Sequence, residues 1–396
     1  MCYVRLTLGM KTISILGSTG SIGTNTLAVI RAFKDRFKVV GLAAGNDAKG
    51  LAAQIAEFKP RVVSVATEEV LETLSRLVDL TGVEVLVGTL GMTSVATAEE
   101  AETVVAAAVG AVGLVPTLAA IRSGKDVALA NKETLVMAGE IMTREQRARG
   151  TRILPIDSEH CALHQCLDKR DPSSVSKLWL TASGGPFRTR PRETFGSITI
   201  DEALNHPTWR MGRKITVDSA TLMNKALEII EAHWLFGVPG ERIDVVVHPQ
   251  SVVHSMVEFK DGTMLAQLGR TDMRIPIQYA LSYPEAWTTA LPPMDLASAL
   301  SLTFEPPDHA RFPSLHLAQR ALTQGGTTPA AMNAANEVAV QAFLDGEIPF
   351  TGITGIVSDV VATHESRPAT TIEAVLGADS AARLQAKEAC AVLART

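Results

Sequence analysis

The chain contains 396 residues, of which 46% are hydrophobic and 20% are charged. This composition is ordinary for a globular protein and excludes a largely disordered chain, and the length predicts two or three domains. The net charge of −5 and the aromatic content of 5% argue against a nucleic-acid partner, which usually requires a basic surface or aromatic stacking platforms. The four scattered cysteines do not form a disulfide framework, so we expect a reducing, cytoplasmic location.

Neither the N-terminus nor the most apolar segment indicates secretion or membrane insertion. Met1–Gly9 carries one arginine and no long apolar run, so it is not a signal peptide. Thr103–Ile121 has 19 residues without a charge, which is close to the length of a membrane span. Its two glycines and its proline favour a buried strand, a glycine turn and a short helix instead. We therefore expect no membrane partner.

Short apolar runs alternate with helical segments in the first third of the chain. Ile22–Lys34 and Leu51–Phe58 have helical periodicity, and strands that alternate with helices form a parallel sheet that is buried on both faces. We predict the α/β class, with an N-terminal Rossmann-like domain over residues 1–150 whose ligand lies at the carboxyl ends of the strands. The predicted strands are Ile13–Leu16, Val39–Ala43, Val62–Val65, Val83–Val87, Val104–Ala107, Val127–Ala130 and Ile153–Ile156.

The pattern changes in the second third of the chain. Val252–Phe259 alternates between apolar and polar residues, Asp261-Gly262 is a tight-turn pair, and Thr263–Leu268 supplies a return strand. These features predict an antiparallel hairpin in an α+β catalytic domain over residues 151–290.

The last third is predicted to be helical. Five prolines between Ala290 and Pro313 favour a linker over residues 291–312, because prolines interrupt regular elements. Residues 313–396 then form a C-terminal helical domain.

The first predicted strand runs into a glycine-rich turn at the start of a helix. Gly17, Gly20 and Gly23 follow at three-residue intervals. Glycines let the backbone approach a pyrophosphate, and free amides with the helix dipole favour the anion. The alternative is a glycine turn without a ligand. No acid ends the second strand before Asp47, which favours the 2′-phosphate of NADP over NAD, although the charge of Asp47 opposes that phosphate.

Two carboxylates follow the last of the predicted parallel strands. As residues i and i+2 of a strand, Asp157 and Glu159 would face the same side. Two neighbouring carboxylates indicate a bridging cation, and oxygen ligands favour Mg²⁺ or Mn²⁺ over zinc. A solvated acidic loop is the alternative.

A second segment with polar residues is Asp218–Glu228, which is predicted to begin a capped helix. Asn224 and Glu228 are i and i+4, and Lys225 and Glu228 are i and i+3, so an amide, an ammonium and a carboxylate share one face. The alternative is a surface helix with an ordinary Lys–Glu ion pair.

Two loops have the composition of anion-binding loops. Thr181–Pro186 is rich in hydroxyl groups and glycine, and His206–Gly212 places Trp209 in a loop, where an exposed ring requires a functional reason. The alternative for the second loop is a turn anchored by a buried tryptophan.

Seven motifs in order, from about Lys11 to the end of the chain, resemble the 1-deoxy-D-xylulose 5-phosphate reductoisomerase family. That family uses NADPH and a divalent cation (Mg²⁺ or Mn²⁺) to convert 1-deoxy-D-xylulose 5-phosphate to 2-C-methyl-D-erythritol 4-phosphate in the non-mevalonate route to isoprenoids. The resemblance implies a small phosphorylated sugar substrate and a homodimer with a C-terminal helical bundle. The motifs are G-S-T-G-S-I-G at Gly17–Gly23, A-N-K-E at Ala130–Glu133, D-S-E at Asp157–Glu159, A-S-G-G-P at Ala182–Pro186, H-P-x-W-x-M-G at His206–Gly212, D-S-A-T-x-M-N-K-x-L-E at Asp218–Glu228 and N-A-A-N-E at Asn333–Glu337.

The resemblance also implies roles for individual residues. The catalytic residues would be Lys132, Asp157, Glu159 and Glu228, and the three carboxylates among them would hold the metal. The substrate would be bound by Lys132, Ser158, Glu159, Ser183, His206, Trp209 on a closing flap, Ser219, Asn224, Lys225 and Glu228. The cofactor would be bound by Thr19, Gly20, Ser21, Ile22, Gly45, Asn46, Asn131, Glu133 and Gly212.

One position departs from the family pattern. Members often carry a basic residue and then Asn after the glycine that follows the second strand, whereas this chain has Gly45-Asn46-Asp47. We expect a smaller preference for NADPH as a result, and we expect Asp47 to cap the next helix.

Two other functions stay open. An acylating Rossmann dehydrogenase would use Cys161 as the nucleophile with His160 or His164 as the base. A non-catalytic NADP-sensing regulator would need neither the metal nor the phosphate site.

Overall fold

The computed structural model describes residues 10–168, 170–289, 291–295 and 301–395, which group into two compact units. The first unit comprises the described parts of Met1–Asn131, Glu145–Ile156 and Met273–Leu291. The second comprises the described parts of Lys132–Arg144, Asp157–Asp272 and Pro292–Thr396.

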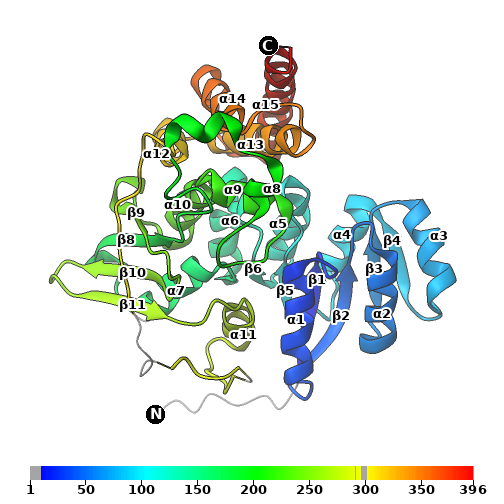
Figure 1. Ribbon diagram of the computed structural model, residues 1–396. Coiled ribbons are helices and arrows are strands. Elements are labelled where there is room, and N and C mark those ends of the chain that lie inside the picture. Colours follow the sequence, from blue (N-terminus) through cyan, green and yellow to red (C-terminus); the bar gives the residue numbers. More distant parts are fainter. Residues whose placement is uncertain (1–9, 169, 290, 296–300, 396) are drawn as a thin grey trace. The chain divides into compact units, whose positions relative to one another are not determined.

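A parallel sheet of seven strands forms the first unit, in the order β4-β3-β2-β1-β5-β6-β7 (Figure 1). The chain adds strands on one side of β1 as far as β4 and then continues with β5 on the other side. The carboxyl ends of β1 and β5 therefore flank the point at which the strand order reverses, where such sheets bind ligands. The predicted α/β class is confirmed. The strands are β1 (Lys11–Leu16), β2 (Phe37–Ala43), β3 (Val62–Val65), β4 (Glu84–Val87), β5 (Thr103–Ala106), β6 (Asp126–Leu129) and β7 (Ile153–Pro155).

Helices pack against this sheet and bury its apolar side chains, including Ile13, Leu42 and Val105. The uncharged segment after Glu102 is a strand, a 3-10 turn and a short helix, as its glycines and proline predicted. Among the described residues, no helix combines the length and the apolarity that a membrane crossing requires. The helices are α1 (Ser21–Ala32), α2 (Ala48–Phe58), α3 (Glu68–Leu77), α4 (Gly88–Ala96), η1 (Ala111–Gly113), α5 (Leu114–Arg122) and α11 (Arg274–Ser282), and α6 (Lys132–Arg149) begins in the second unit and ends in the first.

The second unit is built around a mixed sheet of four strands in the order β11-β10-β8-β9. Strand β10 is antiparallel to β11 and to β8, whereas β8 and β9 are parallel. The predicted hairpin is the β10–β11 pair. The strands are β8 (Val175–Ala182), β9 (Ile243–Val247), β10 (Val253–Phe259) and β11 (Met264–Leu268).

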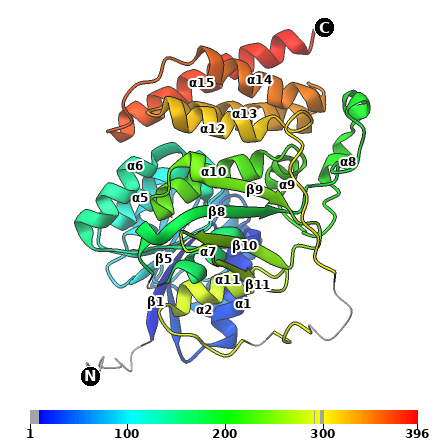
Figure 2. The same cartoon turned by 90° about the vertical axis from the view of Figure 1, so that its left-hand side faces the viewer.

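Helix α10 lies between this sheet and the C-terminal helices (Figure 2). Its apolar residues, among them Leu227 and Ile230, belong to one continuous core with Leu178 of β8 and Ala335 of α13. The helices of this unit are α7 (Ser158–Leu167), η2 (Pro172–Ser174), η3 (Arg192–Ser197), α8 (Ile200–Leu204), α9 (Arg213–Ala220), α10 (Met223–Phe236), η4 (Gly240–Arg242), α12 (Ser314–Gln324), α13 (Thr328–Leu344), α14 (Phe350–Thr363) and α15 (Ile372–Leu393).

Two local predictions were wrong. Asp157 and Glu159 do not share a strand, because β7 ends at Pro155, Asp157 caps α7 and Glu159 lies in the first turn of that helix. The segment from Asp218 onward is not a single helix, because Leu222 adopts the left-handed conformation (φ 57°) between α9 and α10. That conformation is uncommon for any residue other than glycine, so the leucine gave no signal of a break.

Candidate active site

The glycine turn of the first unit joins β1 to α1. Gly17 has a φ of +83°, and a Cβ there would stand 2.6 Å from the carbonyl oxygen of Ala107, so the close approach of the loop after β5 requires glycine. The Nε2 of Gln54, on α2, donates to the carbonyl oxygen of Ser18 at 2.9 Å. Within the described residues, no side chain caps the first amides of α1. These amides and the helix dipole fit a phosphate group.

The residues predicted to bind the cofactor lie in several places. Thr19, Gly20, Ser21 and Ile22 form the glycine turn and the start of α1. Gly45 and Asn46 are exposed just beyond β2. Asn131 of the first unit follows β6 and donates its Nδ2 to the carbonyl oxygen of Gly110 at 2.9 Å. Glu133 and Gly212 belong to the second unit, at the start of α6 and just before α9.

The residue after Asn46 has a structural role. The Oδ1 of Asp47 accepts from the backbone N–H of Gly50 at 2.8 Å, which caps α2. The predicted capping role of Asp47 is therefore confirmed, and its side chain is held by the helix that it begins.

Three carboxylates converge in the second unit. Asp157, Glu159 and Glu228 each offer an oxygen, and these oxygens lie within 4.8 Å of one another. Glu228 is completely buried, and the side chains of the other two are 10% and 16% exposed. A compact set of carboxylate oxygens is the donor set that Mg²⁺ or Mn²⁺ prefers, so these residues fit a hard divalent cation.

Two buried ammonium groups neutralise this cluster. The Nζ of Lys132 lies 2.6 Å from Asp157 Oδ2 and 2.9 Å from Glu228 Oε1, and it donates to Asn224 Oδ1 at 2.9 Å. Lys225 donates to Glu228 Oε2, and its Nζ is 3.6 Å from Glu159 Oε2. The predicted polar face of Asn224, Lys225 and Glu228 is thus present on α10, but Lys225 and Glu228 are buried, so the alternative of a surface ion pair was wrong.

The carboxylates of the cluster differ in acidity. Burial raises the pKa of Glu159 to about 8, with Glu228 and Asp157 adding to the rise and Lys225 opposing it. Burial also acts to raise the pKa of Asp157, but Lys132 and His160 outweigh it and hold that pKa well below its usual range. Without a bound cation, the carboxyl group of Glu159 therefore retains its proton to a higher pH than that of Asp157 does.

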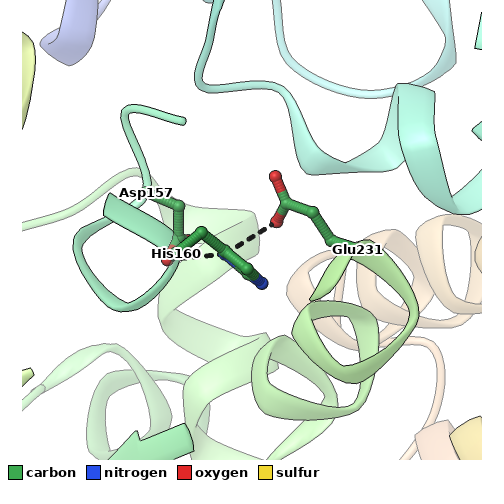
Figure 3. Close-up of side chains that lie close together, drawn as sticks. All are labelled: Asp157, His160 and Glu231. Carbon is green, nitrogen blue, oxygen red and sulfur yellow. Dashed lines mark ion pairs between the residues drawn. The ribbon is translucent and has the colours of Figure 1, made fainter. Parts of the chain in front are cut away.

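His160 links Asp157 to Glu231 (Figure 3). Its Nδ1 lies 3.1 Å from Asp157 Oδ1 and 3.2 Å from Glu231 Oε2, and its Nε2 lies 2.9 Å from the carbonyl oxygen of Glu228. The two carboxylates beside Nδ1 and the carbonyl oxygen beside Nε2 favour the protonated form of the ring. Burial would lower the pKa of His160, but Glu231 and Asp157 raise it to about 9. A doubly protonated ring cannot bind a metal, so this second group of potential ligands fits a cation less well.

Residues from two loops and from the last turn of α9 meet at a separate polar cluster. The Nε2 of His206 is 3.2 Å from Ser183 Oγ and 3.0 Å from Ser219 Oγ. Gly185 has a φ of +69°, and a Cβ there would stand 2.6 Å from the carbonyl oxygen of Ser219, so glycine brings the β8 loop against the end of α9. Burial lowers the pKa of His206 to about 4, which leaves a neutral ring between two hydroxyl groups at neutral pH.

The loop that begins at His206 carries a partly exposed tryptophan. Trp209 is neither fully buried nor fully exposed, and its backbone N–H donates to His206 Nδ1 at 3.0 Å. The indole is therefore not completely buried, but its partial burial does not exclude a role in anchoring the turn.

Sequence comparisons agree with this arrangement. Family profiles match at residues 13–139 (1-deoxy-D-xylulose 5-phosphate reductoisomerase), 153–236 (its C-terminal domain) and 268–385 (DXP reductoisomerase C-terminal domain). A 1-deoxy-D-xylulose 5-phosphate reductoisomerase of Symbiobacterium thermophilum is 55% identical over 96% of this chain and 98% of its own length. The chain belongs to the 1-deoxy-D-xylulose 5-phosphate reductoisomerase family.

Solved reductoisomerase structures have the same fold. A DOX-P reductoisomerase in complex with NADPH, fosmidomycin and magnesium superposes with a TM-score of 0.93 at 41% identity, over 97% of this chain and 99% of that one. The 1-deoxy-D-xylulose 5-phosphate reductoisomerase from Zymomonas mobilis in complex with NADPH has a TM-score of 0.90 at 42% identity, over 96% and 99%.

The sequence analysis considered His160 only as a possible base for Cys161, and it missed Glu231 and His254 beside the three carboxylates. His160 and Glu231 form the pair behind Asp157, and His254 of β10 is buried with its Nδ1 4.0 Å from Glu159 Oε1. The spacing in the sequence gave a weak indication that these residues belong to the site. His160 is i+3 from Asp157, Glu231 is i+3 from Glu228, and His254 interrupts an apolar strand.

The thiol considered as a nucleophile is in the wrong environment. Cys161 is buried, and burial raises its pKa to about 12. A nucleophilic cysteine needs a lowered pKa. The acylating dehydrogenase alternative therefore has no support in the geometry.

Proposed function

We propose that the carboxylate cluster of the second unit is the active site of a 1-deoxy-D-xylulose 5-phosphate reductoisomerase. The chain converts 1-deoxy-D-xylulose 5-phosphate to 2-C-methyl-D-erythritol 4-phosphate with NADPH and a divalent cation, in isoprenoid biosynthesis. The observation that carries this proposal is the convergence of Asp157, Glu159 and Glu228 beside Lys132 and Lys225. A regulator that only senses NADP would not need this buried set of charges.

Asp157, Glu159 and Glu228 would hold the cation. When bound there, the cation supplies a Lewis acid that polarises the ketone of the substrate and lowers the pKa of its neighbouring hydroxyl group. Lys132 and Ser158 adjoin these carboxylates, since Ser158 Oγ donates to Glu159 Oε2 at 2.9 Å. Both side chains can therefore orient the oxygens of the substrate.

Lys132 contributes as a fixed hydrogen-bond donor rather than as a base. Burial would lower the pKa of this ammonium group, but Asp157, Glu228 and Glu231 outweigh burial and hold it well above its usual value. The group thus stays protonated at neutral pH. It can donate to a substrate oxygen on which negative charge develops when that oxygen replaces one of its present acceptors, Asp157, Asn224 or Glu228.

Ser183, His206, Ser219, Asn224 and Lys225 would bind the phosphate side of the substrate. The two hydroxyl groups and the neutral imidazole are hydrogen-bond donors without charge, and Lys225 supplies the positive charge. The phosphate group is remote from the reacting carbons, so its binding energy holds those carbons in place. Closure of the Trp209 loop would exclude water from the site.

The glycine turn of the first unit would bind the pyrophosphate of NADPH. Thr19–Ile22 present backbone amides, and Gly45 and Asn46 follow β2 where the 2′-phosphate of such a cofactor lies. NADPH supplies the hydride that reduces the rearranged aldehyde. We further propose that the protein is a homodimer of the cytoplasm.

One assay tests this function. The oxidation of NADPH is followed by the absorbance of its nicotinamide at 340 nm. 1-Deoxy-D-xylulose 5-phosphate is the substrate, and the assay is run with and without EDTA. We expect turnover that EDTA abolishes and that added Mg²⁺ or Mn²⁺ restores. Turnover that is indifferent to EDTA would contradict the cation site, and NADPH binding without turnover would favour the regulator.

A further inference from the structure

The N-A-A-N-E motif of α13 has no place in the proposed function. Its second asparagine, Asn336, is completely buried, and its Nδ2 donates to Asp218 Oδ1 at 2.8 Å. Asp218 is also buried and lies in the last turn of α9. A buried amide that donates to a buried carboxylate is part of a specific network, because such groups are costly without partners.

The network continues from Asp218 to the first turn of α6. The other oxygen of Asp218 lies 2.9 Å from the Nζ of Lys214, and the same Nζ donates to Glu133 Oε1 at 2.7 Å. The side chains of Lys214 and Glu133 are 19% and 9% exposed. Lys214 therefore lies between two carboxylates, and its positive charge stabilises both of them in their buried positions. The carboxylate of Glu133 is engaged in this ion pair.

The next residue of the motif extends the network to α15. Glu337 forms an ion pair with Arg383 at 2.6 Å, and Arg383 also pairs with Asp379. The negative charge of Glu337 also raises the pKa of Lys214. Helix α13 thus contributes a hydrogen bond and a nearby charge to α9, and α15 holds that charge through Arg383.

Three members of this network lie within two residues of a residue of the site. Glu133 follows Lys132, Asp218 precedes Ser219, and Lys214 lies two residues after Gly212, where the Trp209 loop ends. Helix α9 therefore carries Ser219 at one end and receives the Trp209 loop at the other. A shift of α9 would move both groups that face the phosphate of the substrate.

We propose that Glu133, Lys214, Asp218 and Asn336 form a positioning network that fixes α9, and with it Ser219 and the His206–Gly212 loop, around the phosphate group of the substrate. The Glu133 carboxylate serves this network rather than the cofactor. The inference rests on the proposed function, because it assigns the network to the phosphate side of that same site.

The test uses the full-length protein with Asn336→Ala and Glu133→Gln. The first removes the amide that holds Asp218, and the second removes the charge that holds Lys214. We expect the KM for 1-deoxy-D-xylulose 5-phosphate and the Kd for fosmidomycin to rise about tenfold, which is the size of the loss of one hydrogen bond to a charged group. The Kd for NADPH should change less than about twofold. Tryptic cleavage after Arg210, in the loop, should become faster.

Matched controls use exposed residues on the same helices. Glu140→Gln on α6 and Gln341→Ala on α13 lie outside the network, so both should behave like the parent protein. Circular dichroism and the Tm establish whether each variant is folded. If Asn336→Ala does not fold, Glu133→Gln decides the question by itself.

Two outcomes would overturn the inference. A tenfold rise in the Kd for NADPH in Glu133→Gln, with an unchanged KM for the sugar phosphate, would assign this carboxylate to the cofactor. Folded variants with parental KM, fosmidomycin affinity and cleavage rate would leave the network without a positioning role. Failure of the proposed function is distinguishable, because it appears as an inactive parent protein, whereas the cleavage and NADPH measurements need no turnover.

Discussion

In the first unit the proposed anion site consists of backbone amides around Gly17, whereas in the second unit the proposed cation site consists of charged side chains such as Glu228 and Lys132. The backbone site lies within one short stretch of sequence and buries no charge. The side-chain site combines residues from α6, α7 and α10, and each buried charge is stable only because its partners are present. Removal of one side chain should therefore have little effect on the first site and a large effect on the second.

The largest effect is expected from Glu228→Gln. This change removes a completely buried carboxylate that accepts from Lys132 and Lys225. Turnover should fall by more than the roughly 10–100-fold that loss of an outer partner of a metal ligand causes. NADPH affinity, measured by fluorescence titration, should stay within about twofold because the glycine turn keeps its backbone amides.

If Glu228→Gln weakens NADPH binding as strongly as it lowers turnover, the two sites are not independent and the expected difference between them is wrong. The exposed Glu241→Gln serves as the control for the substitution itself. Turnover at the parental rate in limiting Mn²⁺ would exclude Glu228 from the cation site.

A smaller effect is expected from Glu231→Gln. Glu231 is not one of the three carboxylates proposed to hold the cation, but it pairs with His160, which also pairs with Asp157 (Figure 3). Loss of such an outer partner typically weakens metal binding about 10–100-fold. Isothermal titration with Mn²⁺, without substrate, measures this directly. An unchanged Kd for Mn²⁺ in a folded variant would show that the His160–Glu231 pair does not orient Asp157.

The affinity for the cation should also depend on pH. The pKa of Glu159 is raised to about 8, chiefly by burial, so the cation must displace a proton from it below that pH. Mn²⁺ affinity should therefore rise by up to about tenfold per pH unit between pH 6.5 and pH 8 and then level off. Titrations in two buffers with different ionisation enthalpies report the released proton. A constant affinity over this range would contradict the raised pKa.

The smallest effect is expected at the edge of the backbone site. Asn46 is exposed and uncharged, so Asn46→Lys should add a charge-assisted hydrogen bond to the 2′-phosphate and raise the preference for NADPH over NADH about tenfold. The ratio of kcat/KM for the two cofactors measures this preference. Asp47→Asn should leave the ratio unchanged because Asp47 caps α2. An unchanged ratio in Asn46→Lys would place position 46 away from the phosphate.

The same contrast explains how much of the molecule could be predicted from its sequence. The glycine turn and the parallel strands were predictable because their signals are local, as in the spacing of Gly17 and Gly23. The convergence of Asp157 with Glu159 was expected for the wrong reason, since a helix cap rather than a strand brings them together. The pairing of Glu133 with Lys214 could not be predicted, because partners 81 residues apart leave no periodic pattern.

Leu222 adopts the left-handed conformation between α9 and α10, and the number of residues at this junction determines which way the side chains of α10 point. Successive residues of an α-helix are rotated by about 100° about its axis, since one turn takes 3.6 residues. Insertion or deletion of one residue at this junction would turn Glu228 away from Asp157 while Ser219 kept its place beside His206. The insertion or deletion of one residue here should thus disrupt the carboxylate cluster as much as the loss of a carboxylate does, even when every side chain of the motif is retained.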